Sequence, residues 1–161
     1  MNIKTCIESL KGTKCWSVVA GPGAGSVIGL GFGKKLPREK PSKNTTLSQD
    51  ELKFDPEIGV LIHCAWRLSK SDKILCGWRD SNELNGEMLR GIMLLRDKKV
   101  EDVFLHRSTY DLEIYYEDSL CLQIFCDQTN DFDSDDNYTL FFGGHYYTVG
   151  LKSKLELDYK E

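Results

Sequence analysis

Residues 88–103 read MLRGIMLLRDKKVEDV, and residues 3–18 read IKTCIESLKGTKCWSV. Both segments begin with apolar residues at helical spacing, pass through a short polar turn and continue into a run typical of a strand. At an offset of 85, Val18 corresponds to Val103, and three apolar helix positions also correspond, Ile3, Ile7 and Leu10 with Met88, Ile92 and Leu95. The sequence therefore predicts the same helix–turn–strand arrangement twice.

Two further strand-like segments follow each copy and also correspond. At an offset of 84, Ile28, Leu30 and Phe32 match Leu112, Ile114 and Tyr116, and at an offset of 62, Val60, Ile62 and Cys64 match Leu122, Ile124 and Cys126. We expect an α+β fold, with one antiparallel sheet or two sheets in contact, and two helices packed on one side. We also expect a single domain, 1–161, with a duplicated αβββ unit in 1–80 and 81–161. The alternative is that any two helix-plus-meander segments would look alike.

Turn residues and spacing place the element boundaries. Residues 34–56 are polar and rich in proline, and predict a long exposed connection. Residues 58–68 predict one strand, and residues 73–80 another. For the second helix, Asp80 or Ser81 is the expected cap, Glu83 completes a capping box, and Leu84 begins the apolar stripe.

Composition limits the class of protein. The 161 residues are 40% hydrophobic and carry a net charge of −4, which is typical of one globular domain and argues against nucleic acid as the main partner. No apolar run is long enough to span a bilayer, and the first residues do not form a signal peptide, so we expect a cytoplasmic protein without membrane contact. Most of the six cysteines lie in apolar runs and are expected to be reduced core thiols.

No motif indicates catalysis or metal binding. Gly21 to Gly33 lacks the spacing of a phosphate-binding loop and precedes a strand instead of a helix. Residues 131–137 resemble half of a calcium loop but lack its glycine and its final glutamate. His63, His106 and His145 have no partners at metal-ligand spacing. We therefore expect no catalytic residue, metal or cofactor.

Charge is distributed unevenly along the chain. From Ser108 to Leu151 there are nine acidic residues and no lysine or arginine, and five of the acids fall within 127–136. One interpretation is a solvated loop that aids solubility. The other is an acidic docking surface for a basic partner, with nearby aromatic anchors. Its predicted residues are Glu117, Asp118, Asp127, Asp131, Asp133, Asp135, Asp136, Tyr138 and Tyr146.

The sequence resembles the small bacterial immunity proteins, which are cytosolic antidotes to toxins delivered between competing cells. The resemblance rests on one α+β domain, reduced cysteines, an acidic segment rich in aromatics, and segments such as Cys64-Ala65-Trp66-Arg67-Leu68 and Ile124-Phe125-Cys126-Asp127. It implies a non-enzymatic inhibitor that binds a cognate toxin domain. Many such toxins are nucleases with basic grooves, which an acidic surface would occupy or flank.

Two other functions stay open on the sequence alone. A small-ligand-binding or regulatory domain would use a pocket between sheet and helices, with Trp66 or Trp78 at its mouth. An enzyme with a dispersed site would place His63 or His106 beside a carboxylate.

Overall fold

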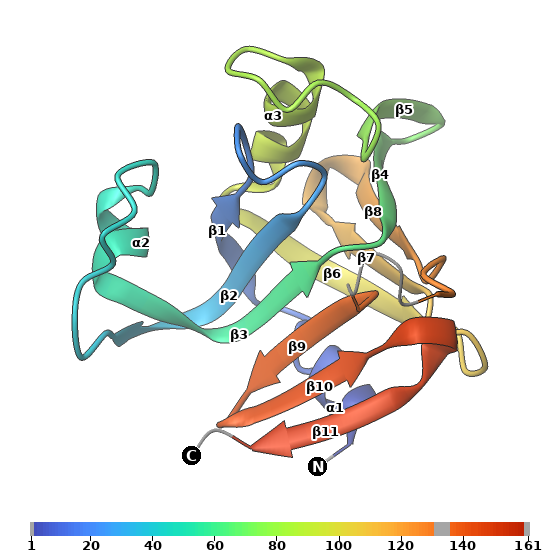
Figure 1. Cartoon of the computed structure of the whole chain (residues 1–161). Coiled ribbons are helices and arrows are strands. Elements are labelled where there is room, and N and C mark those ends of the chain that lie inside the picture. Colours follow the sequence, from blue (N-terminus) through green and yellow to red (C-terminus); the bar gives the residue numbers. More distant parts are fainter. Residues whose placement is uncertain (1, 131–135, 160–161) are drawn as a thin grey trace.

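The strands of the protein form one antiparallel sheet of eleven strands in the order β11-β10-β9-β3-β2-β1-β6-β7-β8-β4-β5 (Figure 1). The computed structural model describes residues 2–130 and 136–159. Buried residues from both halves of the sheet and from the helices α1 and α3 form one hydrophobic cluster. The architecture is therefore α+β, with the sheet as its main component and short helices.

The first part of the chain contains α1 (Ile3–Glu8), β1 (Lys14–Val19), β2 (Ile28–Pro37), α2 (Gln49–Lys53), β3 (Phe54–Ile62), β4 (Ala65–Lys70) and β5 (Lys73–Gly77). The second contains α3 (Glu87–Ile92), β6 (Lys98–Leu105), β7 (Leu112–Tyr116), β8 (Leu120–Phe125), β9 (Tyr138–Phe142), β10 (His145–Val149) and β11 (Leu155–Tyr159). Single 3-10 turns follow three elements, η1 (Met93–Leu95), η2 (Glu117–Ser119) and η3 (Leu151–Ser153).

At the centre of the sheet, β1 and β6 meet around an approximate twofold axis. Lys14 pairs with Lys99, its own counterpart at an offset of 85. The hydrogen bonds on either side are counterparts too: the Gly12 amide donates to the Val100 carbonyl over 2.8 Å, and the Asp97 amide donates to the Cys15 carbonyl over 2.6 Å. Gly12 and Asp97 also share a positive φ, 80° and 66°. The two halves therefore use the same turn to enter the sheet.

The two meanders have matching registers. Phe32 faces a bulge after Cys15 in β1, and Tyr116 faces a bulge after Val100 in β6. Ile28 pairs with Ile62 in the first meander, as Leu112 pairs with Ile124 in the second. These pairs follow the sequence offsets of 84 and 62. The rings of Phe32 and Tyr116 stack on one another with centroids 6.5 Å apart.

Each meander is extended by the hairpin that follows the other one in sequence. The hairpin β4–β5 follows β3 but pairs with β8, whereas β9–β10 follows β8 but pairs with β3. The first inward residues of these hairpins are Trp66 and Tyr138, both fully buried. Trp66 Nε1 donates to the Ser26 carbonyl and Tyr138 Oη to the Tyr110 carbonyl, each over 2.8 Å. Residues 26 and 110 correspond at the offset of 84.

Two expected boundaries and one expected capping box are wrong. The strand expected over 58–68 is two strands, because the amides of His63 and Cys64 both donate to the Asn137 carbonyl and the chain there passes from pairing with β9 to pairing with β8. The helix expected from Asp80 begins at Glu87 and has Gly86 as its cap. The side chain of Asp80 instead accepts from the Gly77 amide, so the expected capping box does not form.

The apolar stripe expected for that helix is correct only in part. Met88, Ile92 and Leu95 are buried, but Leu84 precedes the helix and is 77% exposed. The connection expected over 34–56 is also partly wrong, because β2 continues to Pro37 and α2 follows with a capping box between Ser48 and Glu51.

The helices attach at different places. The helix α1 contacts β6 and β9, whereas α3 packs against β5. The helix α2 stands beside the long extension of β2 and β3 (Figure 1). Within the described residues, no helix has the length and hydropathy needed to cross a bilayer.

Candidate functional site

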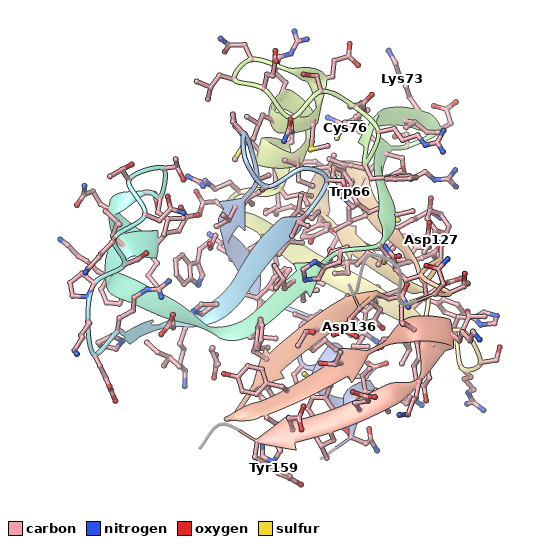
Figure 2. All side chains as sticks on the ribbon, viewed as in Figure 1. Trp66, Lys73, Cys76, Asp127, Asp136 and Tyr159 are labelled. Carbon is pink, nitrogen blue, oxygen red and sulfur yellow. The ribbon has the colours of Figure 1, made fainter. Side chains whose placement is uncertain are left out.

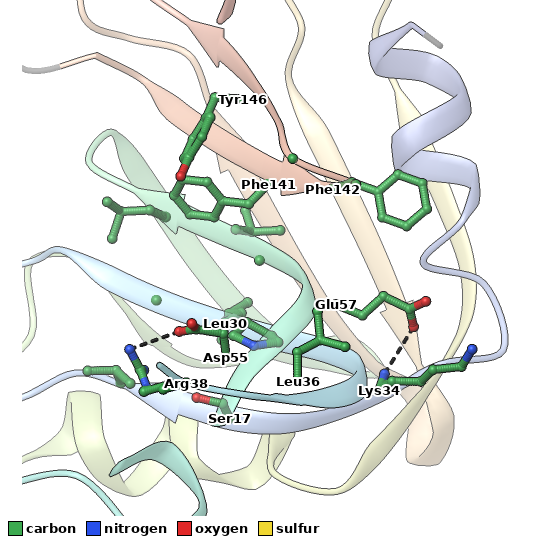
Figure 3. A pocket seen from close by; sticks show the side chains of 18 of the residues that line it. Ser17, Leu30, Lys34, Leu36, Arg38, Asp55, Glu57, Phe141, Phe142 and Tyr146 are labelled. Carbon is green, nitrogen blue, oxygen red and sulfur yellow. Dashed lines mark hydrogen bonds and ion pairs between the residues drawn. The ribbon is translucent and has the colours of Figure 1, made fainter. Parts of the chain in front are cut away.

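An open groove of about 1340 Å³ lies on the outer face of the first half of the sheet (Figure 3). Strand alternation turns Leu30 and Val60 toward the core, and turns Val19, Gly29 and Leu61 outward to line the groove. Phe141 and Tyr146, on β9 and β10, form one side, and their rings meet edge to face at 4.9 Å. The groove therefore has an apolar floor and an aromatic wall.

Three neighbouring positions on this face are glycines and therefore have no side chains. A Cβ on Gly31 would lie 2.9 Å from the Cβ atoms of both Pro56 and Ser17, and a Cβ on Gly59 would lie 2.7 Å from the Phe141 ring. These two glycines are required because those side chains pack directly onto the strand backbone. Gly29 differs, since its nearest neighbours would be Val19 and Leu61 at 3.7 and 3.9 Å. An alanine fits at Gly29, so internal packing does not explain this glycine.

The wall opposite the aromatic pair comes from the extension of β2 and β3 and is charged. Arg38 forms an ion pair of 2.8 Å with Asp55, and the Glu57 carboxylate accepts from the Lys34 amide over 3.0 Å (Figure 3). Leu36 lies between these polar contacts and is 46% exposed. This wall presents both signs of charge around an apolar residue, which suits a partner that is apolar at its centre and polar at its edges.

A buried carboxylate attaches α2 to the sheet beside this groove. Glu51 Oε1 accepts from Ser17 Oγ at 3.0 Å, from the Val18 amide at 3.2 Å and from Arg96 Nη2 at 3.0 Å. Arg96 Nη2 also donates to the Val18 carbonyl at 3.1 Å. Because β6 pairs with β1 only at Lys14 and Cys15, the free edge of β1 at Val18 is satisfied by the Glu51–Arg96 pair instead of a strand.

The second half carries side chains at the positions that are glycine in the first. Register places Glu113, Tyr115 and Cys121 where the first half has Gly29, Gly31 and Gly59. Two of these side chains are joined by a hydrogen bond, since the Tyr115 hydroxyl donates to Glu113, and the other oxygen of that carboxylate accepts from Gln123 over 2.7 Å. The groove is thus confined to one of two corresponding faces.

Two of the acids predicted to bind a partner form contacts within the chain. Asp118 forms an ion pair with Lys98, and Glu117 accepts from the Lys99 amide over 2.9 Å. The contact with Lys98 lowers the pKa of Asp118, and the same contact raises the pKa of Lys98. Both acids therefore lie at the turn between β7 and β8, beside basic residues of β6.

The other predicted acids lie elsewhere or outside the described residues. Asp127 follows β8, at the opposite end of the β7–β8 hairpin from Glu117 and Asp118, and accepts from the Ala65 amide over 3.1 Å (Figure 2). Asp136 is exposed just before β9. Asp131, Asp133 and Asp135 fall outside the described residues, as does most of the expected half calcium loop.

The two predicted aromatic anchors have different positions. Tyr138 is fully buried, so its assignment to an exposed binding surface is wrong. It was assigned by its closeness in sequence to the acids, but strand alternation directs it into the core, where burial raises the pKa of its hydroxyl well above the usual value. Tyr146 is half-buried and lines the groove.

Most of the groove is not predicted by the sequence pattern. Its glycines and Phe141 are spread over three strands, and their position on one face depends on the pairing of β9 with β3. The available indication was that Gly29, Gly31 and Gly59 alternate with apolar core residues, which marks outward positions without side chains. Glu51 was also missed, because it lies in a segment interpreted as a loop.

Other candidate residues have clear positions. Trp66 is buried in the core and Trp78 is 37% exposed. The cysteines are free thiols, and burial raises the pKa of Cys6 to about 11 and of Cys76 to about 12. In the part of the chain that the structure describes, no three or more histidine, cysteine or acidic side chains are grouped so that they could hold a metal ion.

Searches against protein-family models, curated protein sequences and solved structures each found no match for this chain.

Proposed function

We propose that the protein is a non-enzymatic binding protein of the antidote kind, which neutralises a cognate toxin domain by contact. An apolar segment of that partner would occupy the groove, between Phe141 and Tyr146 on one side and Leu36 on the other. Gly29 carries the proposal, since it lies in a strand where glycine costs about 0.5–1 kcal/mol relative to alanine, and no internal contact requires it. Glycine inside a strand often marks a close approach by another molecule.

The size of the groove favours a protein segment over a small ligand. Its volume of about 1340 Å³ exceeds the roughly 300–1,000 Å³ of ordinary ligand pockets, and it is open to solvent. Exposed aromatic and aliphatic side chains inside a polar rim are typical of interfaces between proteins. A small-ligand site between sheet and helices has less support, because Trp66 is fully buried in the core.

The acidic surface is a separate part of the proposal. Asp127 and Asp136 are exposed and would speed association with a basic toxin domain. Glu117 and Asp118 would contribute less, since Asp118 is already paired with Lys98 and Glu117 already accepts from the Lys99 amide. We thus assign affinity to the groove and speed of association to the acids.

We also infer that the halves are copies of one αβββ unit. The pairing of Lys14 with Lys99 and the matching bonds of Trp66 and Tyr138 support this interpretation. In a duplicated chain, one copy is free to lose side chains from its outer face while the other keeps them.

The proposal is tested by looking for an adjacent gene that encodes a secreted protein with a C-terminal toxin domain, and by co-expressing that domain with this chain. We expect a one-to-one complex and protection of bacterial growth. Val19→Arg places a charge on the groove floor and should weaken the complex at least tenfold. Phe104→Arg is the matched control, because Phe104 occupies the corresponding exposed position of the second half and should leave binding unchanged.

Three outcomes would overturn the proposal: no complex with that domain, no such secreted protein beside the gene, or equal loss of binding with both variants. Circular dichroism of each variant separates loss of binding from loss of folding.

A further inference from the structure

The half of the sheet formed by β6, β7, β8, β4 and β5 has an apolar and basic surface around β4, β5 and β8. Ile74 is 58% exposed and Trp78 37% exposed, although both are large apolar residues. With Arg67, Arg79 and Phe125 they line a shallow depression of about 370 Å³. We call these five residues the arginine–tryptophan patch. It lies on the end of the sheet that carries Lys73 and Cys76, away from Tyr159 on β11 (Figure 2).

A chain of hydrogen bonds fixes the guanidinium of Arg67. Its Nε donates to Gln123 Oε1 over 2.6 Å, and Gln123 Nε2 donates in turn to Glu113 Oε1 over 2.7 Å. The guanidinium carbon lies 5.3 Å from the centre of the Phe125 ring, which supports the group from one face. Binding normally reduces the side-chain entropy of an arginine. Arg67 is already ordered in the free protein, so it loses less entropy when a partner binds.

The remaining donors of Arg67 are unused. Throughout residues 2–130 and 136–159, neither η nitrogen of Arg67 has a hydrogen-bond or ion-pair partner. Two parallel N–H groups in fixed orientation match the two oxygens of a carboxylate. Arg67 is therefore arranged to bind a carboxylate that the described part of the chain does not provide.

Arg79 adds a second uncompensated positive charge. Its guanidinium lies 5.0 Å from the centre of the Trp78 ring and has no ion-pair partner among the described residues. Asp80 is adjacent in sequence, but its Oδ2 accepts from the Gly77 amide over 2.7 Å. Two guanidinium groups thus stand on aromatic rings beside exposed apolar side chains.

We propose that the arginine–tryptophan patch binds an acidic, partly apolar segment of a protein partner. The fork of Arg67 would hold one carboxylate, Arg79 a second, and Trp78 and Ile74 would cover an apolar residue between them. Trp and Arg are the residues that most often dominate binding energy at protein interfaces. This surface lies on the other half of the sheet from the groove, so the inference goes beyond the proposed function and does not depend on it.

The surroundings favour a protein over a nucleic acid. The chain has a net charge of −4, and the carboxylates of Glu113 and Asp80 lie close to the patch. A long polyanion would be repelled by this field, whereas a short acidic segment needs only the two arginines.

The test uses two labelled eight-residue peptides, one alternating Glu with Leu and one alternating Lys with Leu, and a single-stranded oligonucleotide. Fluorescence anisotropy with the full chain should show binding of the Glu–Leu peptide and a reduction of Trp78 accessibility to iodide quenching. The Lys–Leu peptide and the oligonucleotide should bind at least tenfold more weakly.

Variants then separate recognition from charge. Arg67→Ala should weaken binding of the Glu–Leu peptide about tenfold, and Arg67→Lys should restore only part of it, because lysine keeps the charge but lacks the fork. Gln123→Ala keeps every charge and should weaken binding severalfold by releasing Arg67. Arg107→Ala is the matched control, since Arg107 is exposed in the loop between β6 and β7, outside the patch.

The inference is overturned if the Glu–Leu peptide does not bind, if the oligonucleotide binds more tightly than the peptide, or if Arg107→Ala weakens binding as much as Arg67→Ala. None of these results would bear on the groove, whose test uses the toxin domain and Val19.

Discussion

The outer faces of the two halves of the sheet carry different side chains at positions where the strand register is the same. The first half has Gly29, Gly31 and Gly59 at the positions where the second half has Glu113, Tyr115 and Cys121. The register of the corresponding residues is the same in both, yet one face is hollow and apolar, while the other carries a hydrogen-bonded row that ends at Arg67. The register of a sheet therefore fixes where side chains stand, and a few substitutions decide what kind of surface results.

The largest expected effect is the loss of stability that follows replacement of Glu51. Glu51→Ala removes the partner of Arg96 and leaves the buried Val18 amide unsatisfied, so it should lower the free energy of unfolding by about 3 kcal/mol. Urea titration followed by circular dichroism measures this change. Asp102→Ala, at the position corresponding to Ser17 in the second half, removes an exposed ion pair with Lys11 and should leave the midpoint almost unchanged. Equal shifts for both variants would show that α2 does not seal the sheet edge.

The next effect concerns Gly31, because neighbouring side chains pack directly onto its backbone. Gly31→Ala brings a Cβ to 2.9 Å from Pro56 and Ser17, and overpacking of this kind should cost about 1–3 kcal/mol. Tyr115→Ala, the corresponding position of the second half, is exposed and should change stability by only about 0.5 kcal/mol. Thermal unfolding of the two variants checks the difference, and similar melting temperatures would contradict the close packing over Gly31.

A smaller effect is expected at Tyr138, which with Trp66 forms the pair of hairpin anchors, the first inward residues of the two exchanged hairpins. Tyr138→Phe removes the bond to the Tyr110 carbonyl and should cost about 1 kcal/mol. Burial raises the pKa of Tyr138, so the folded state retains a proton that the unfolded state loses above pH about 10. Stability should therefore be constant below that pH and fall as the pH rises beyond it.

Its counterpart Trp66 does not titrate, so the loss of stability at alkaline pH arises at only one of the two anchors. Urea midpoints between pH 8 and pH 11 should fall less steeply in Tyr138→Phe than in the original protein. An unchanged slope would mean that other buried groups, such as Tyr116, account for the whole loss.

Much of the pairing scheme was predictable, because the apolar residues of both meanders repeat at constant offsets. Ile28, Leu30 and Phe32 face the core, as do their counterparts in β7. The exchange of hairpins was not predictable, since β4 continues the pattern of β3 and nothing local to His63 or Cys64 indicates that the chain changes partners there.

The candidate site was less accessible to sequence reasoning. Closeness in sequence grouped Tyr138 with the acids, although alternation buries it, and Tyr146 was selected for the acidic surface but lines the groove. Glu51 resembles an ordinary loop carboxylate until Ser17, Val18 and Arg96 are brought around it. Each of these misassignments involves residues joined only by long-range pairing.

The smallest expected effect is a gain in stability. Gly29→Ala fits without close contacts, and replacing a strand glycine should raise the free energy of unfolding by about 0.5 kcal/mol. The same methyl group would stand on the floor of the groove, so affinity for the proposed partner should fall. Isothermal titration calorimetry beside urea titration tests both, and a stabilised variant with full affinity would argue against contact at Gly29.

The exchange of hairpins also sets an order of events during synthesis. When the ribosome has released only the first half, β3 lacks the strand that will cover its outer edge, because Tyr138–Phe142 has not yet been made. At the same stage β4 and β5 are available but have no β8 to pair with. The edge of β1 that pairs with β6 is open at this stage too, so the nascent chain exposes unpaired edges on β1, β3 and β4 until the second half emerges.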